Sequence, residues 1–258
     1  MTKNDKRFYA QYDEDRALAH IFARTERGTC LEVGANDGVH LSNTYHFEQL
    51  GWRCILVEPN SDCCDRIRKC RQATLFECAA SATEGQAVLH VGYGSDDVYS
   101  SLEAEPHTNC REGYRPVVVP TRTLDSILEE SGIETLDFVT IDVEGHECET
   151  LRGFTLDRWR PRLVLIEDGH DFTDFEAEHR MRQSGYFRFW RSGANDWYAR
   201  NGARRAILLA QILSSRCFSW KGLLKGNLPR ALMRKVVVTK RSLLGLIRSL
   251  FRASVLSG

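Results

Sequence analysis

The sequence lacks several features that define large classes of proteins. It has no apolar run approaching the roughly 20 residues of a membrane-spanning helix, and its polar N-terminus has no apolar signal-peptide core. Its nine cysteines form no Cys-x-x-Cys pair and have no Cys/His spacing typical of a zinc site. We therefore expect neither a membrane-spanning nor a zinc-binding protein, and we predict a reducing, cytoplasmic location.

Acidic residues are missing from one part of the chain. Residues 201–258 carry twelve Lys and Arg and no Asp or Glu, so residues 1–200 hold 23 basic groups against 35 acidic ones. Leucines and isoleucines between 243 and 250 can share one helical face, with Arg241, Arg248 and Arg252 on the other. This pattern predicts a peripheral contact with the inner, anionic face of a membrane. Packing on the acidic part of the chain or in a homo-oligomer stays open, whereas nucleic acid is disfavoured because aromatic residues are scarce.

The chain also lacks the Gly-x-Gly-x-x-Gly turn that brings a dinucleotide's pyrophosphate close to the backbone. It has instead Cys30-Leu-Glu-Val-Gly-Ala-Asn-Asp-Gly38, an apolar run followed by two glycines four residues apart. This order predicts a buried strand, a tight turn and a helix whose N-terminus faces a ligand. A second apolar run, Cys54-Ile-Leu-Val57, ends in Glu58, which can accept hydrogen bonds from both hydroxyls of a ribose. The two strands together predict a nucleoside site.

The residues of the turn favour one nucleoside. Asp37 would repel a diphosphate but tolerates a cationic sulfonium, and Glu32 at the end of the first strand also favours a positive charge. S-adenosylmethionine therefore fits better than NAD. An NAD-dependent oxidoreductase, a non-catalytic nucleoside-binding scaffold and an ordinary tight turn remain alternatives.

Strand and helix patterns alternate along most of the chain. Strands are predicted at 29–33, 53–57, 73–78, 87–91, 117–121, 136–141, 162–166, 186–191 and 196–200. Helices are predicted at 13–25, 39–50, 62–70, 123–130, from about 146, and at 172–184. This alternation predicts an α/β fold with a doubly wound, mostly parallel sheet, and the last two strands predict an antiparallel edge. Ligands bind such sheets beyond the carboxyl ends of the strands, where Glu32, Glu58, Asp142 and Glu167 are expected.

Seven segments between residues 31 and 198 carry motifs that are found together. They are Leu31-Glu-Val-Gly-Ala-Asn-Asp-Gly-Val39, Ser42-Asn-Thr44, Val57-Glu-Pro-Asn60, Ser100-Ser-Leu102, Thr121-Arg-Thr-Leu-Asp125, Ile141-Asp-Val-Glu-Gly-His-Glu147 and Asn195-Asp-Trp-Tyr198. With Gln11-Tyr-Asp-Glu-Asp15 upstream, the chain resembles the FkbM-type S-adenosylmethionine-dependent methyltransferases. The resemblance implies a seven-stranded Rossmann-like methyltransferase domain at 29–200, after a helical lead-in at 1–28 and before the basic helical extension at 201–258. It also implies methyl transfer to an oxygen, often of a sugar or a polyketide.

The predicted cofactor is S-adenosyl-L-methionine. Glu32 would hold its ammonium and Glu58 its ribose, while the backbone at Gly34 would contact its methionine portion. Ala79 and Ala80 would leave a flat slot for the adenine, although close packing explains these alanines equally well. The expected cofactor contacts are Glu32, Gly34, Ala35, Asn36, Gly38, Glu58, Ala79, Ala80 and Asp142.

A base is needed for the acceptor, because a sugar hydroxyl is a weak nucleophile at neutral pH and must lose its proton as the new bond forms. We predict His146 as this base, since an imidazole titrates near neutrality, with Asp142 or Glu144 orienting it or binding the acceptor. His170 is the rival base. In the simplest alternative, His146 only caps the following helix and Asp142 closes the cofactor site.

Acidic residues at neighbouring strand ends could also hold magnesium, which prefers oxygen ligands. The candidates are Asp142, Glu144, Glu167 and Asp168. Because such clusters more often bind hydroxyl groups, we predict no metal. The acceptor is expected to be a sugar or glycoconjugate hydroxyl, in a pocket to which Gln11, Glu14, Asp15 and residues 93–116 contribute.

Overall fold

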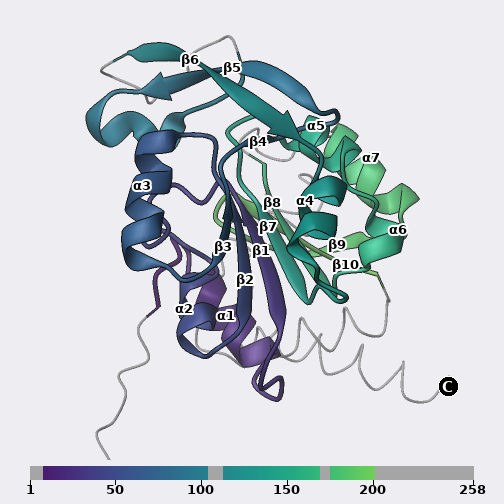
Figure 1. Ribbon diagram of the computed structural model, residues 1–258. Coiled ribbons are helices and arrows are strands. Elements are labelled where there is room, and N and C mark those ends of the chain that lie inside the picture. The colour runs from purple at the N-terminus through teal and green to yellow at the C-terminus, as the bar shows by residue number, and fades with distance from the viewer. Residues whose placement is uncertain (1–7, 104–112, 169–174, 201–258) are drawn as a thin grey trace, which may run out of the picture.

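A seven-stranded sheet forms the centre of the computed structural model, which describes residues 8–103, 113–168 and 175–200 (Figure 1). The strand order is β3-β2-β1-β7-β8-β10-β9; pairing is parallel from β3 to β8, and β10 is antiparallel to both neighbours. The strands are β1 Thr29–Val33, β2 Arg53–Val57, β3 Thr74–Phe76, β7 Phe138–Ile141, β8 Leu163–Glu167, β9 Phe187–Ser192 and β10 Asn195–Ala199. The predicted Rossmann-like sheet with an antiparallel edge is confirmed, whereas the predicted helical extension at 201–258 lies outside the described residues.

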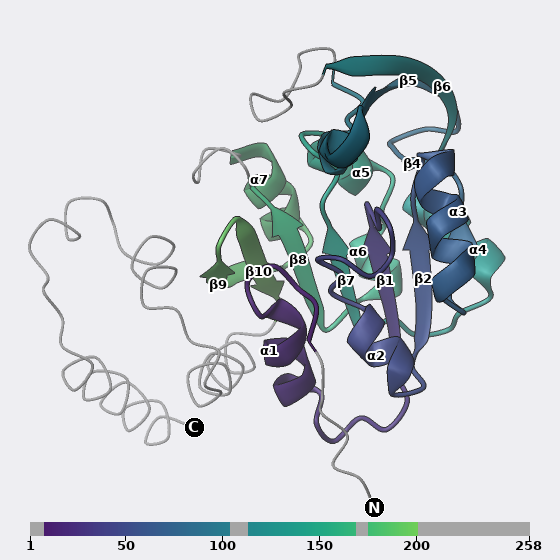
Figure 2. The same ribbon diagram turned by 90° about the vertical axis from the view of Figure 1, so that its left-hand side faces the viewer.

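Helices cover both faces of this sheet (Figures 1 and 2). Successive strand residues point to opposite faces, so Cys30 packs with α1, α2 and their neighbours, and Leu31 packs with α4 to α7. Helix α3 packs through Ile67 on Leu56. The helices are α1 Glu14–Ile21, α2 Tyr45–Gln49, α3 Ser61–Cys70, α4 Leu124–Ser131, α5 Glu147–Arg152, α6 Leu156–Trp159 and α7 Phe175–Gln183. None of the helices in the described part of the chain combines the length and apolar character that crossing a membrane requires.

The connection between β1 and β2 differs from the sequence-based prediction. A single helix is predicted at 39–50, but the structure has only the short α2 there. The side chains of Ser42 and Thr44 and the backbone N–H of Asn43 all donate to the buried carboxylate of Glu32. These three contacts, together with a φ of 62° at Leu41, hold the residues before α2 in a loop that surrounds the end of β1.

A second, three-stranded sheet lies above the main sheet in Figure 1. Its order is β4-β6-β5, with β5 and β6 antiparallel along their length. The strands are β4 Ala79–Ala80, β5 Gly85–Gly92 and β6 Tyr114–Arg122. Leu89, Val91 and Val119 form a small core with Ala79. The sequence predicts the two longer strands of this layer but not that they form a sheet of their own.

Candidate active site

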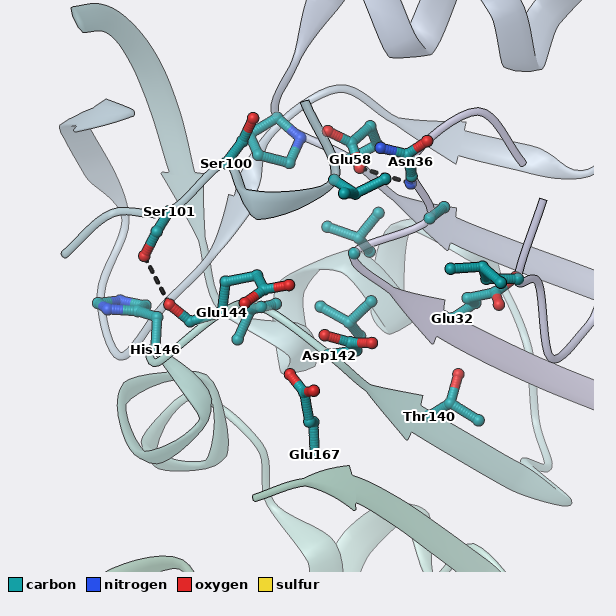
Figure 3. A pocket seen from close by; sticks show the side chains of 18 of the residues that line it. Glu32, Asn36, Glu58, Ser100, Ser101, Thr140, Asp142, Glu144, His146 and Glu167 are labelled. Carbon is teal, nitrogen blue, oxygen red and sulfur yellow. Dashed lines mark hydrogen bonds between the residues drawn. The ribbon is translucent and has the colours of Figure 1, made fainter. Parts of the chain in front are cut away.

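A cavity of about 520 Å³ lies at the carboxyl ends of β1, β2, β7 and β8 (Figure 3). Residues at or just after the carboxyl end of each strand form its wall, among them Gly34 after β1, Glu58 after β2, Asp142 after β7 and Glu167 at the end of β8. The second sheet contributes Leu89 and both residues of β4. This is the position at which open α/β sheets bind their ligands.

Gly34 allows the ends of three strands to approach closely. Its backbone N–H donates to Val57 O at 2.9 Å, and its φ of 81° lies in the left-handed region that favours glycine. A Cβ atom at this position would overlap the backbone carbonyl of Asp142. The turn after β1 therefore places bare backbone on the cavity wall, followed by Ala35, which also lines the cavity.

Asp37 and Gly38, which belong to the same turn, lie outside the cavity lining. The carboxylate of Asp37 accepts the N–H groups of Val39 and His40, at 2.8 and 2.7 Å, and is not part of the cavity lining. Gly38 is also outside the lining, beside Ile67 of α3. The repulsion between Asp37 and a diphosphate is therefore no longer an argument against NAD. The prediction that Gly38 contacts the cofactor has no support from its position.

Glu58 is 5% exposed and is held by two backbone groups. Its Oε2 accepts the N–H of Asn36 at 2.8 Å (Figure 3), and its Oε1 accepts that of Asn60 at 2.9 Å. Burial raises the pKa of this carboxyl to about 7. Because a carboxylate has about four acceptor positions, Glu58 can still accept hydrogen bonds from a ribose. Asn36 orients Glu58 through its backbone and also lines the cavity.

Glu32 is 4% exposed and borders the cavity, but its oxygens already have partners. Ser42 Oγ donates at 2.8 Å, the Asn43 N–H at 2.6 Å and Thr44 Oγ1 at 2.5 Å, while Arg71 Nη1 lies 3.9 Å away. Burial raises the pKa of Glu32, and Arg71 and the two hydroxyls oppose that shift. Its evident function is to organise the loop before α2, and its contact with a cofactor ammonium stays a prediction.

An apolar wall closes the cavity on the side of the second sheet. Ala79 and Ala80 line it, together with Leu89 and the short helix η1 Gly94–Tyr99, which contributes Asp97, Val98 and Tyr99. The contact of the two alanines with an adenine stays a prediction. Asp97 is held by Arg66 of α3. The sequence signals of these three residues are weak, because they lie in a stretch rich in glycine, serine and charges that shows little periodicity.

Three carboxylates converge on the opposite side of the cavity. One oxygen from each of Asp142, Glu144 and Glu167 lies within 4.8 Å of the others, and in Figure 3 the three carboxylates point toward one another. Desolvation, followed by the charge of Glu167, raises the pKa of Asp142 well above its ordinary value. Desolvation, Glu167 and Glu147 raise the pKa of Glu144 to about 8. Near neutral pH this cluster, here called the acidic cluster, can both donate and accept hydrogen bonds. Its oxygens would also suit a divalent cation, so the absence of a metal stays a prediction.

His146 has contacts on both ring nitrogens. Its Nε2 lies 3.2 Å from Ser81 Oγ and its Nδ1 3.3 Å from Glu103 Oε1, while Ser101 Oγ donates to the Glu144 carbonyl at 2.6 Å. Together these contacts connect the segment after β7 to the second sheet. In Figure 3 the imidazole lies to the far side of Glu144 from Asp142. His146 is thus placed to position Glu144.

The residue after β8 does not join the acidic cluster. Asp168 accepts a hydrogen bond from Arg191 at 3.2 Å, and Arg191 also lies 3.3 Å from Asp196. Glu167 is therefore the acid of the predicted Glu167–Asp168 pair that reaches the cavity. His170, the predicted rival base, lies outside the described residues.

The raised pKa values predict how stability depends on pH. Glu58 and Glu147 have pKa values raised to about 7 and Glu144 to about 8, mainly by burial. Such carboxyls stabilise the fold below their unfolded pKa of about 4.3, and this contribution is lost as pH rises through the folded pKa. The melting temperature of the ligand-free protein should therefore fall between about pH 5 and pH 8, and less steeply in Glu144→Gln. A melting temperature that rises over this interval would contradict the assignment.

Fold and site together define an open α/β protein whose ligand cavity lies at the carboxyl ends of the strands and has one mainly apolar wall and one acidic wall. Residues 32–192 match the family model of the methyltransferase FkbM domain. The chain therefore belongs to the FkbM methyltransferase family, and the resemblance seen in its motifs is confirmed. Membership in this family implies a methyl donor. It therefore favours a methyltransferase over the NAD-dependent oxidoreductase that the sequence left as an alternative.

Two curated relatives share part of the chain. The 2-O-methyltransferase NoeI of Sinorhizobium fredii is 30% identical over 152 residues, which cover 53% of this chain and 61% of NoeI. The hexuronic acid methyltransferase AglP of Haloferax volcanii is 25% identical over 167 residues, which cover 58% of this chain and 62% of AglP. The chain thus spans about three fifths of the length of each.

Among solved structures, a precorrin-6y C5,15-methyltransferase of Geobacter metallireducens aligns with 76% of this chain and 92% of its own, at 16% identity and a TM-score of 0.40. A score this low carries no inference about the site.

Proposed function

We propose that this chain is an S-adenosylmethionine-dependent O-methyltransferase acting on a hydroxyl group of a sugar or glycoconjugate. The observation that carries the proposal is one cavity that joins two different walls. Gly34, Glu58 and the alanines of β4 form a wall suited to a nucleoside, and the acidic cluster forms a wall suited to hydroxyl groups. A methyl donor and an alcohol therefore both have matching surfaces within one space.

Two orphaned polar atoms support the fit of the cofactor. Asn43 Oδ1 and Thr140 Oγ1 belong to residues that line the cavity. Both atoms are shielded from solvent and have no hydrogen-bond partner among the described residues. Thr140 pairs with Glu32 in the register of β1 and β7. Because buried polar groups are normally satisfied, a polar ligand group is expected here. The ammonium of a methionine moiety matches the Asn43 acceptor and the negative charge of Glu32.

The remaining parts of the cofactor have matching residues as well. Glu58 would accept hydrogen bonds from the ribose hydroxyls, and Ala79 and Ala80 would face the adenine. Gly34 and Ala35 would contact the methionine portion through bare backbone. When bound, S-adenosylmethionine supplies an electrophilic methyl group on a cationic sulfur, and the acidic walls favour that positive charge.

The chain itself must orient the acceptor and accept its proton. Asp142, Glu144 and Glu167 can hold neighbouring hydroxyls, and Glu144 in its ionised form can take the proton of the reacting one. His146, predicted as the base, contacts Ser81 and Glu103 instead. We therefore assign it a positioning function, in which it fixes the segment that carries Glu144.

The relatives support an oxygen acceptor in different degrees. By its name NoeI methylates an oxygen at a 2-position, and AglP acts on a hexuronic acid, which is a sugar acid. Both are distant from this chain, so the acceptor class is argued mainly from the chemistry of the acidic cluster.

Ligand-dependent melting tests the cofactor. We expect S-adenosylhomocysteine, but not NAD, to raise the melting temperature, since ligand at 100 times its dissociation constant stabilises a fold by about 2.7 kcal/mol. Glu58→Gln should weaken S-adenosylhomocysteine binding at least about tenfold by calorimetry. A glutamine oxygen cannot serve Asn36, Asn60 and two ribose hydroxyls together.

Glu147→Gln is the matched control for this experiment. Glu147 is as buried as Glu58, also has a pKa raised to about 7, and lies outside the cavity lining. Its Oε1 alone accepts the N–H groups of Val143 and Gly145, so glutamine keeps both bonds. Equal affinities of the two variants would refute the role of Glu58. A shift with NAD alone would overturn the proposal, and no shift with either ligand would favour a non-catalytic scaffold.

A further inference from the structure

One aromatic ring lies on the cavity wall close to the acidic cluster. Tyr12 lines the cavity and is 41% exposed. Its ring packs against Gly193, where a Cβ atom would overlap the ring carbons. Burial and the charges of Glu14, Glu167 and Asp142 raise the pKa of Tyr12, which agrees with a position beside the cluster.

A buried carboxylate holds Tyr12 in this place. Glu14 is 1% exposed, and its Oε2 accepts the Tyr12 N–H at 2.8 Å. Its Oε1 accepts Ser192 Oγ at 2.7 Å and Asn195 Nδ2 at 3.0 Å, on either side of the β9–β10 turn. The segment before α1 is thereby fixed to the antiparallel edge of the sheet, so the ring is a built part of the cavity wall.

The Asp and Glu side chains of the cavity lining dominate the charge near this ring, and Arg191 is the opposing charge. No Lys or Arg side chain belongs to the cavity lining as far as residues 8–103, 113–168 and 175–200 are concerned. The two arginines of the neighbouring strand β9 already pair with carboxylates. Arg188 lies 2.8 Å from Asp196, and Arg191, whose Nε also donates to Gly193 O at 3.0 Å, bonds Asp168 and Asp196. The raised pKa values of Asp142 and Glu144 indicate that this wall already disfavours further negative charge. An anionic ligand group here would add to that charge, and no Lys or Arg of the described cavity lining would compensate it.

We propose that the acceptor is an uncharged glycosyl ring that stacks on Tyr12 and directs its hydroxyls to Asp142, Glu144 and Glu167. A pyranose has a C–H face, which suits the negative face of an aromatic ring, and a rim of hydroxyl donors, which suits carboxylates. A uronic acid carries an additional carboxylate that this wall repels. The inference rests on the proposed methyltransferase function, and it distinguishes this chain from its relative AglP, which is named for a hexuronic acid.

Matched acceptors test the charge selection. Transfer of labelled methyl groups from S-adenosylmethionine is measured to p-nitrophenyl glucoside, galactoside, mannoside and fucoside, and to p-nitrophenyl glucuronide and galacturonide. The glucoside and the glucuronide differ only in whether C6 is an alcohol or a carboxylate. We expect at least one neutral glycoside to be methylated with kcat/KM at least about tenfold above that of either uronide, which is about 1.4 kcal/mol. Equal or preferential methylation of a uronide, or no methylation of any neutral glycoside by a protein that binds S-adenosylhomocysteine, would overturn the inference.

Variants of Tyr12 test the stacking surface. Tyr12→Ala should raise KM for the accepted glycoside at least about tenfold, while Tyr12→Trp and Tyr12→Phe retain it because they keep an aromatic face. Tyr93→Ala is the matched control. Tyr93 begins the range 93–116 that was expected at the acceptor pocket, but it is 46% exposed and lies outside the cavity lining. Affinity for S-adenosylhomocysteine should be unchanged in all four. If Tyr12→Ala behaves like Tyr93→Ala, the inference is wrong although the methyltransferase stands; if the wild type binds no S-adenosylhomocysteine, the proposed function itself fails.

Discussion

Gly34→Ala is expected to cost about 4 kcal/mol or more of stability, because Gly34 leaves less room for a Cβ atom than any other glycine in the described part of the chain. The substitution has two unfavourable effects. A φ of 81° alone costs an alanine roughly 1–2 kcal/mol. The new Cβ would also overlap the carbonyl of Asp142, which lies at the end of a buried strand and cannot move without disturbing its pairing. Since whole domains are stable by about 5–15 kcal/mol, much of the protein should be unfolded at moderate temperature.

Gly51→Ala separates these two effects. Gly51 has a φ of 84°, nearly that of Gly34, but a Cβ there would find no atom within 4 Å. Only the conformational cost of roughly 1–2 kcal/mol should appear. Urea unfolding of both variants measures the free energies, and the difference between them reports the close approach of β1 and β7. Equal losses would show that the turn can relax away from Asp142.

The main sheet could be predicted from the sequence because each strand carries its own signal. The bounds of β1 and β2 agree with the prediction, since both are short apolar runs that end in an acid and a turn. The helix predicted at 39–50 is wrong, and the reason cannot be read from the local sequence pattern. Buried Glu32 takes hydrogen bonds from Ser42, Asn43 and Thr44, and this tertiary contact overrides the helical periodicity.

The sequence predicts those parts of the candidate site that lie at the carboxyl ends of neighbouring parallel strands. Parallel strands bring their carboxyl ends to one edge of the sheet, and Asp142 and Glu167 meet there because β7 and β8 are neighbours. Which of two consecutive acids faces the cavity was not predictable, because Asp168 is turned away by Arg191, which lies on another strand. The function of Tyr12 was likewise hidden, since it depends on a bond between Glu14 and the β9–β10 turn almost 180 residues later.

The role of His146 could not be predicted from the sequence either, because its residue type favours a general base and its contacts favour a positioning function. An imidazole is an attractive base in any sequence, yet here its two nitrogens contact Ser81 and Glu103. Residue type predicts what a side chain can do, and its neighbours decide which of these functions it has. The assignment of the base to Glu144 therefore has a direct kinetic test.

Glu144→Gln should lower kcat by about 10²–10⁴-fold, the usual contribution of a general base. Because the pKa of Glu144 is raised to about 8, its carboxyl is mostly protonated at neutral pH, and the basic form increases as pH rises through that value. The wild-type kcat/KM should accordingly rise with pH up to about 8–9, and this limb should disappear in Glu144→Gln. His146→Gln should keep the limb and lose about tenfold at most, through poorer positioning of Glu144.

The opposite pattern would restore the first prediction. If His146→Gln removed the limb and most of the activity while Glu144→Gln kept both, the imidazole would be the base, and its contacts with Ser81 and Glu103 would have to open when the acceptor binds. Calorimetry with S-adenosylhomocysteine checks that neither substitution acts through the cofactor, since neither residue is assigned to it. With affinity unchanged, a loss confined to kcat locates the defect at proton removal, because an interaction made only in the transition state lowers kcat and kcat/KM equally.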